Sequence, residues 1–137
     1  MLNYAIIGCG RISPNHIMAA IENNLNIIAL CDLIPACMED KILKCGLPGN
    51  IKKYIDYKEM LAKEDIDLVA IATESGKHAA IALDCIDKGI NVIIEKPIAL
   101  SLEDADAIIA AAERKGVKVS ACHQNRFNKS IQKIREA

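Results

Sequence analysis

The sequence is poor in aromatic residues and carries no excess of charge of either sign. It has no tryptophan and only 3% aromatic residues, so its core must be aliphatic. Its net charge of −1, from 17 basic and 18 acidic residues, excludes a strong field for binding nucleic acid or an anionic membrane. No apolar run approaches the ~20 residues of a membrane span, and the N-terminus lacks the basic segment of a signal peptide. With 52% hydrophobic residues, the 137-residue chain predicts a cytoplasmic globular domain.

The cysteines form no pattern typical of a metal site or a disulfide scaffold. There are six of them, with no C-x-x-C pair and no histidine nearby at metal-ligand spacing. Scattered cysteines inside apolar runs behave as small hydrophobic residues. We therefore predict that they are structural and that the chain has no metal site.

Short apolar runs alternate with segments of helical periodicity along the whole chain. We expect strands at 4–7, 26–31, 53–54, 68–72, 91–94 and 117–122, and helices at 14–24, 35–45, 58–63, 75–88 and 101–116. The strands are continuous apolar runs, which is typical of parallel strands covered on both faces. The predicted fold is α/β, a doubly wound parallel sheet with six strands and helices on both faces.

Serines and glycines mark the expected helix ends. Ser13, Ser75 and Ser101 are all placed as N-terminal caps, and Ser101 forms a capping box with Asp104. The segment 129–137 looks like the start of a helix with nothing after it. We therefore expect a truncated piece of a longer protein, with a domain at 1–124 and the start of a connection to a second domain at 125–137.

A glycine-rich turn follows the first expected strand. In Gly8-Cys9-Gly10-Arg11-Ile12-Ser13, the first glycine permits a tight turn and Gly10 lets the backbone approach a pyrophosphate at the next helix. Between a strand and a helix, this is the dinucleotide-binding fingerprint of a Rossmann fold, with Ser13 in the place of the third glycine. The alternative is a glycine turn that holds no ligand.

Asp32 ends the second expected strand, about 20 residues beyond the glycines, where an acidic residue accepts both ribose hydroxyls. A carboxylate there repels a 2′-phosphate, and Leu33 and Ile34 offer no arginine to attract one. This favours NAD over NADP. The alternative is that Asp32 only caps the turn before Pro35.

Lys96 follows the fifth expected strand in the sequence Glu95-Lys96-Pro97, at the edge of the sheet where ligands bind in this architecture. It is placed to donate a proton or hydrogen bond to a substrate oxygen beside the nicotinamide. The alternative is an exposed lysine in an ion pair with Glu95.

Together these motifs resemble the glucose–fructose oxidoreductase/inositol dehydrogenase/MocA family. The resemblance rests on Gly8-x-Gly10, His16, Asp32, Thr73-x-x-x-x-His78, Glu95-Lys96-Pro97 and His123-Gln124-Asn125-Arg126-Phe127. It covers the whole chain, but only the N-terminal part of a family member. Members are NAD(P)-dependent oxidoreductases, mostly of sugars and cyclitols, with a second α/β domain.

The resemblance implies a role for several residues. Lys96 would be the catalytic lysine, and the Lys96–Pro97 bond would be cis. The residues that would line the cofactor are Gly8, Gly10, Arg11, Ile12, Asp32, Thr73, His78 and Glu95. The segment 123–128 is similar to that of the sugar-nucleotide 3-dehydrogenases, which would bring Gln124, Asn125 and Arg126 near the nicotinamide or substrate. The whole protein would be a homo-oligomer with a sugar or sugar-nucleotide substrate.

Two departures from the family pattern concern the active site. Glu74 stands where the family usually has proline, which adds a negative charge near the nicotinamide pocket. The Asp/His pair that usually completes the active site would fall beyond residue 137.

The three histidines have different expected roles. His16 is expected to be hydrogen-bonded and structural, and His123 to support the end of the sixth strand. For His78, packing at a helix end and contact with the cofactor both stay open.

The leading hypothesis is the cofactor domain of an NAD-dependent dehydrogenase of sugar, cyclitol or sugar-nucleotide hydroxyls, inactive by itself. A methyltransferase that uses S-adenosylmethionine also fits a glycine turn and an acidic strand end, although Glu95-Lys96-Pro97 argues against it. A non-catalytic NAD sensor or scaffold is the third possibility.

Overall fold

A six-stranded parallel sheet forms the centre of the computed structural model, which describes residues 1–136. Its strands are β1 (Asn3–Ile7), β2 (Asn26–Cys31), β3 (Lys52–Tyr54), β4 (Leu68–Ile71), β5 (Asn91–Glu95) and β6 (Val119–Cys122). They lie in the order β3-β2-β1-β4-β5-β6, and every pair is parallel. This is the doubly wound order, in which the direction of winding reverses beside β1. The predicted α/β fold is confirmed.

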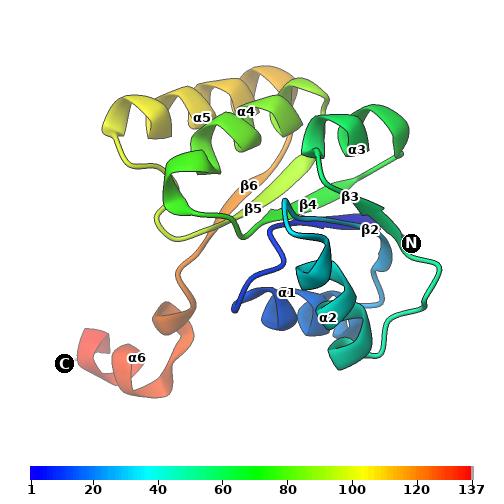
Figure 1. The fold of residues 1–137 in the computed structure, drawn as a ribbon. Coiled ribbons are helices and arrows are strands. Elements are labelled where there is room, and N and C mark those ends of the chain that lie inside the picture. Colours follow the sequence, from blue (N-terminus) through cyan, green and yellow to red (C-terminus); the bar gives the residue numbers. More distant parts are fainter. Residues whose placement is uncertain (137) are drawn as a thin grey trace.

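Helices cover both faces of this sheet (Figure 1). The helical segments are α1 (Ser13–Glu22), α2 (Pro35–Cys45), α3 (Tyr57–Lys63), η1 (Ser75–Lys77), α4 (His78–Asp87), α5 (Leu102–Lys115), η2 (Gln124–Phe127) and α6 (Lys129–Glu136). The helices α1 and α2 lie on one face, and α3, α4 and α5 lie on the other. None of the helices in residues 1–136 is both long enough and apolar enough to cross a membrane.

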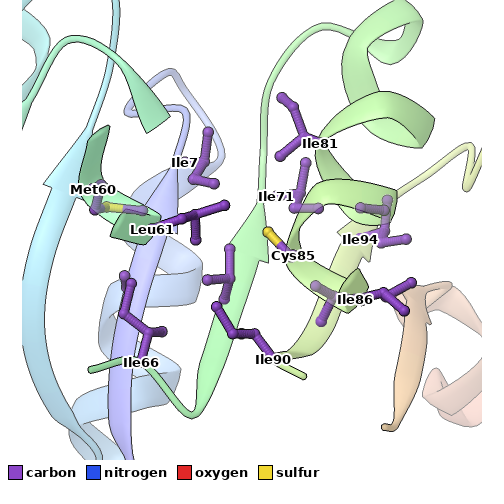
Figure 2. Close-up of a cluster of buried hydrophobic side chains, with 14 of the residues drawn as sticks. Ile7, Met60, Leu61, Ile66, Ile71, Ile81, Cys85, Ile86, Ile90 and Ile94 are labelled. Carbon is purple, nitrogen blue, oxygen red and sulfur yellow. The ribbon is translucent and has the colours of Figure 1, made fainter. Parts of the chain in front are cut away.

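The central strand β1 supplies side chains to two separate aliphatic cores. Tyr4 and Ile6 point toward α1 and α2, whereas Ala5 and Ile7 point toward α3 and α4. This alternation, with both faces buried, explains why the strand is a continuous apolar run. Figure 2 shows the larger core, in which side chains of α3 and α4 pack onto β1, β4 and β5. Burying each such isoleucine or leucine contributes about 1.5–3 kcal/mol, so aliphatic packing replaces the missing aromatic residues.

The predicted helix caps are only partly correct. Ser101 is the N-cap of α5, and its Oγ accepts a hydrogen bond of 3.1 Å from the Asp104 N–H. Ser13, in contrast, is the first residue of α1, and its Oγ donates to the Gly10 carbonyl at 2.7 Å. Ser75 begins η1 and makes no side-chain cap. A hydroxyl in these two turns therefore does not stabilise the following helix in the predicted way.

Several predicted elements differ in extent from the observed ones, and α1 for example ends at Glu22 rather than at residue 24. The helix expected at 75–88 is divided into η1 and α4, because the first turn has 3-10 geometry. The last strand begins at Val119 rather than at residue 117. The helix expected at 129–137 is observed as α6, and its last expected residue, 137, lies outside the described part of the chain.

Gly8, at the end of β1, is held in a conformation and a space that only glycine suits. Its φ is +97°, and a Cβ atom on it would lie 2.5 Å from the Ala72 carbonyl oxygen. Gly10 differs, since a Cβ there would meet nothing within 4 Å. The two glycines of the turn therefore serve different purposes.

We expect Gly8→Ala to destabilise the fold by about 3 kcal/mol or more, because backbone strain adds to overlap with the Ala72 backbone after β4. Gly10→Ala is the matched control and should change stability by less than about 1 kcal/mol. Urea unfolding of both variants measures the difference. Equal stabilities would show that the close approach at Gly8 does not constrain the fold.

Candidate functional site

The glycine turn between β1 and α1 lies against the carboxyl ends of the neighbouring strands. The Gly8 N–H donates to the Cys31 carbonyl of β2 at 2.8 Å, and on its other side Gly8 contacts the backbone after β4. Gly10 is exposed at the top of the turn and has open space around its Cα. This arrangement leaves room for a ligand to approach the backbone and the start of α1, as a dinucleotide pyrophosphate requires.

Asp32 joins the glycine turn to the loop that precedes α2. Its Oδ2 accepts from the Cys9 N–H at 2.7 Å, and its Oδ1 accepts from the Ile34 N–H at 2.8 Å. The turn-capping role considered for this residue is thus observed. Each carboxylate oxygen keeps a further lone pair, so the same group can still accept from a ribose diol.

A pocket of about 490 Å³ opens at this edge of the sheet. Its lining consists of Ile7, Gly8, Gly10, Cys31, Asp32, Leu33, Ile34, Ile55, Tyr57, Ala72, Thr73, Glu74, Lys77 and Ile81. Four of these were predicted cofactor residues: Gly8, Gly10, Asp32 and Thr73. The lining is mostly apolar with a few convergent polar groups, which is typical of cofactor sites.

The apolar part of the pocket was not predicted from the sequence. Leu33 and Ile34 are exposed, with 80% and 59% relative accessibility, and Ile55 has 56%. The one signal in the sequence for this apolar surface was the position of Leu33 and Ile34 directly after Asp32. Aliphatic residues that follow a strand end and stay exposed favour a binding surface. Ile55 lies in the β3–α3 connection and Tyr57 begins α3, and no local pattern places them beside the glycine turn.

His78 is buried at the start of α4 and connects two loops of the site. It is 1% exposed, with Nδ1 at 2.7 Å from the Pro97 carbonyl oxygen and Nε2 at 3.0 Å from the Thr73 carbonyl oxygen. Both ring nitrogens thus face backbone groups of the protein. This geometry favours the packing role over direct contact with a cofactor, and it fixes the loop after β4 to the loop after β5.

Glu95 and Lys96, although adjacent, have different environments. Glu95 Oε1 lies 2.8 Å from His16 Nε2, and its Oε2 accepts from the Lys96 backbone N–H at 3.3 Å. The Lys96 side chain is exposed and makes no ion pair with residues 1–136. The alternative of a Lys96–Glu95 ion pair is therefore not observed, whereas the hydrogen bond expected for His16 is confirmed. The Lys96–Pro97 bond is cis, as expected.

The remaining predicted site residues are placed less closely around the pocket. Arg11 is exposed and Ile12 is half-buried at the start of α1. Gln124, Asn125 and Arg126 are all exposed on η2, which follows β6 where the chain leaves the sheet (Figure 1). The His123 side chain is exposed as well, so it does not support the end of β6 as predicted.

Curated relatives match nearly all of this chain, which spans 35–42% of the length of the first three. A D-apiose dehydrogenase of Paraburkholderia graminis is 35% identical over 97% of this chain and 35% of its own length. The rhizopine catabolism protein MocA of Rhizobium meliloti is 31% identical over 96% of this chain and 40% of its own length.

Solved structures are also similar. The WlbA dehydrogenase from Chromobacterium violaceum, in complex with NADH and UDP-GlcNAcA, has a TM-score of 0.89 at 30% identity. The match covers 99% of this chain and 39% of that one. An oxidoreductase from Agrobacterium radiobacter, in complex with NAD+, L-tartaric acid and magnesium, has a TM-score of 0.88 at 27% identity, over 98% of this chain and 39% of that one.

A family model described as an oxidoreductase family with an NAD-binding Rossmann fold matches residues 2–123, which is most of the chain. The predicted resemblance is confirmed by this match, and the methyltransferase alternative is wrong. The chain belongs to the glucose–fructose oxidoreductase/inositol dehydrogenase/MocA family and contains its NAD-binding Rossmann domain.

Proposed function

We propose that this chain is the cofactor-binding part of an NAD-dependent dehydrogenase that oxidises a hydroxyl of a sugar, cyclitol or sugar nucleotide. The observation that carries the proposal is the combination, at one edge of the sheet, of the glycine turn, Asp32 and a Lys96 that makes no ion pair within residues 1–136. The relatives support it, since dehydrogenases of D-apiose and inositol are among them.

The pocket residues would bind the cofactor through separate contacts. Gly10 and the start of α1 would hold the pyrophosphate, and Asp32 would accept from the ribose hydroxyls. Leu33, Ile34 and Ile55 offer apolar surface for a nucleobase. When bound, NAD supplies the acceptor for a hydride. Among the predicted contacts, Arg11, Ile12, Thr73, Glu95, Gln124, Asn125 and Arg126 stay predictions, and His78 would act through the loops that it connects.

Lys96 would handle the proton of the substrate hydroxyl. Its ammonium group is exposed at the carboxyl edge of β5, and Glu95 is already engaged by His16. A lysine without a carboxylate partner is free to donate a hydrogen bond to a substrate oxygen and to exchange a proton with it. The Glu95–His16 pair would fix the backbone from which Lys96 projects.

We propose further that residues 1–124 form the cofactor domain and that 125–137 lead into a second domain that binds the substrate. The exposed apolar side chains of Phe127 on η2 and Ile134 on α6, with 76% and 70% accessibility, support this division, because exposed apolar side chains that gather on one segment and are rimmed by polar residues are typical of an interaction surface. Substrate choice and any homo-oligomer would then depend on that domain.

We expect NAD to bind with at least about tenfold higher affinity than NADP, because the Asp32 carboxylate would lie beside the extra phosphate. Isothermal titration with both cofactors measures the preference. Asp32→Asn should reduce it, while Glu74→Gln, which neutralises another carboxylate of the pocket, should not. Equal affinities in the unchanged protein would remove Asp32 from its assigned role.

The 137-residue chain should bind NADH but oxidise no substrate, because the glycine turn and Asp32 are present while the proposed substrate domain is not. Fluorescence titration with NADH and a turnover assay with sugar nucleotides and inositols check both parts. Steady formation of NADH by this chain would contradict the two-domain proposal. If the whole protein also binds NAD without turnover, the sensor alternative is favoured instead.

In the whole protein, Lys96→Ala should lower kcat by about 10²–10⁴-fold, the usual contribution of a positioned acid or base. Lys96→Arg should not restore it, because a guanidinium with a pKa above ~12 does not exchange protons near neutrality. NAD affinity should change little. Lys88→Ala is the control, because Lys88 lies at the C-terminal end of α4, whereas His78, at the other end of this helix, faces the site. Near-normal turnover of Lys96→Ala would exclude the catalytic role.

A further inference from the structure

Three potential metal ligands from distant parts of the sequence meet at the carboxyl ends of β5 and β6. They are His16 of α1, Glu95 at the end of β5 and Cys122 at the end of β6, and their ligand atoms all lie within 4.8 Å of one another. No other such group was found in residues 1–136. The chain was predicted to have no metal site because its cysteines and histidines are not close together in the sequence. That criterion does not detect ligands that strand pairing brings together from distant parts of the chain.

The distances between these atoms are close to those that a tetrahedral zinc ion requires. Zinc lies about 2.0–2.3 Å from nitrogen, oxygen and sulfur ligands, so its ligand atoms are about 3.3–3.8 Å apart. His16 Nε2 and Glu95 Oε1 are 2.8 Å apart, and every pair in the cluster is within 4.8 Å. Small side-chain rotations, which lengthen the 2.8 Å separation of His16 and Glu95 and shorten any separation near 4.8 Å, would therefore place all three around one ion.

The cluster is screened from water, which strengthens its electrostatic interactions. The side chains of His16 and Glu95 are 10% and 14% exposed. Cys122, at the end of β6, is half-buried beside them. A carboxylate at Glu95 and a thiolate at Cys122 would repel each other in this shielded place. A divalent cation between them would neutralise both negative charges at once.

We propose that His16, Glu95 and Cys122 form a binding site for a zinc-type divalent cation. Nitrogen, carboxylate and thiolate donors in one tetrahedral site are characteristic of Zn²⁺, and water would take the fourth position. On binding, the S–H bond of Cys122 breaks, a zinc–sulfur bond forms and the proton leaves to solvent. In the metal-free protein the His16 Nε2–H donates to Glu95, so on metal binding the ring proton moves through solvent from Nε2 to Nδ1 and the bare Nε2 coordinates the ion. No group is oxidised or reduced.

Cobalt and zinc titrations of the reduced 137-residue chain test the site without cofactor or substrate, so the result does not depend on the proposed function. Co²⁺ should bind with a stoichiometry of one and produce a thiolate-to-cobalt charge-transfer band in the near ultraviolet. Zn²⁺ should displace it, and competition with a chromophoric chelator gives the zinc affinity.

Three variants identify the ligands. Cys122→Ala should abolish the charge-transfer band and lower the zinc affinity by about 100-fold or more, since even loss of an outer partner costs 10–100-fold. His16→Gln should lower the affinity to a similar degree while keeping the band. Cys37→Ser is the matched control, because Cys37 is also half-buried but lies on α2 outside the cluster, and it should behave like the unchanged chain.

Circular dichroism confirms that each variant is folded, and Cys122→Ser, which is nearly isosteric, replaces Cys122→Ala if the latter is not. Absence of a one-to-one cobalt complex would overturn the proposal. So would a complex that survives both Cys122 substitutions, or one that is lost in Cys37→Ser, because the metal would then be held elsewhere.

Discussion

The contact between the Gly8 backbone and the segment after β4 is the constraint on which the site depends. β1 is the central strand, and its end must fit between β2 and β4 at the point where the winding reverses. With no side chain at Gly8, the Cys31 and Ala72 carbonyl groups can both approach it. Asp32 then bonds to the Cys9 N–H and holds the turn in place. The pocket exists because these backbone segments meet there without side chains between them.

Much of the fold could be predicted because its signals are local. A continuous apolar run such as 68–71 predicts a strand buried on both faces, and helical periodicity followed by Gly46 or Gly116 predicts where a helix ends. The errors in the predicted helix caps concern hydrogen-bond partners. Ser13 has the residue type of a helix cap, but its hydroxyl turns back to the Gly10 carbonyl, and sequence alone does not tell which backbone group a hydroxyl will bond.

The candidate site was predictable only where it follows the chain. The glycine turn, Asp32 and Lys96 each belong to a short motif beside a strand end, so their common edge follows from parallel strands. The contacts between motifs were not predictable. The contacts of His16 with Glu95 and of His78 with the Pro97 carbonyl join separate strand–helix units, and they depend on strand order and side-chain rotamers together.

The neighbours Glu95 and Lys96 show how contacts between distant segments decide the roles of residues whose types alone leave those roles open. Neighbouring opposite charges on a surface gain less than about 1 kcal/mol from pairing, so either residue can take another partner at little cost. Glu95 takes His16, in a place shielded from water where a hydrogen bond is stronger. Lys96 is left exposed at the sheet edge without a partner in residues 1–136. Glu95 is held in place by His16 and can position the backbone, while the Lys96 ammonium group stays available for proton transfer. This division of roles supports the function proposed for Lys96.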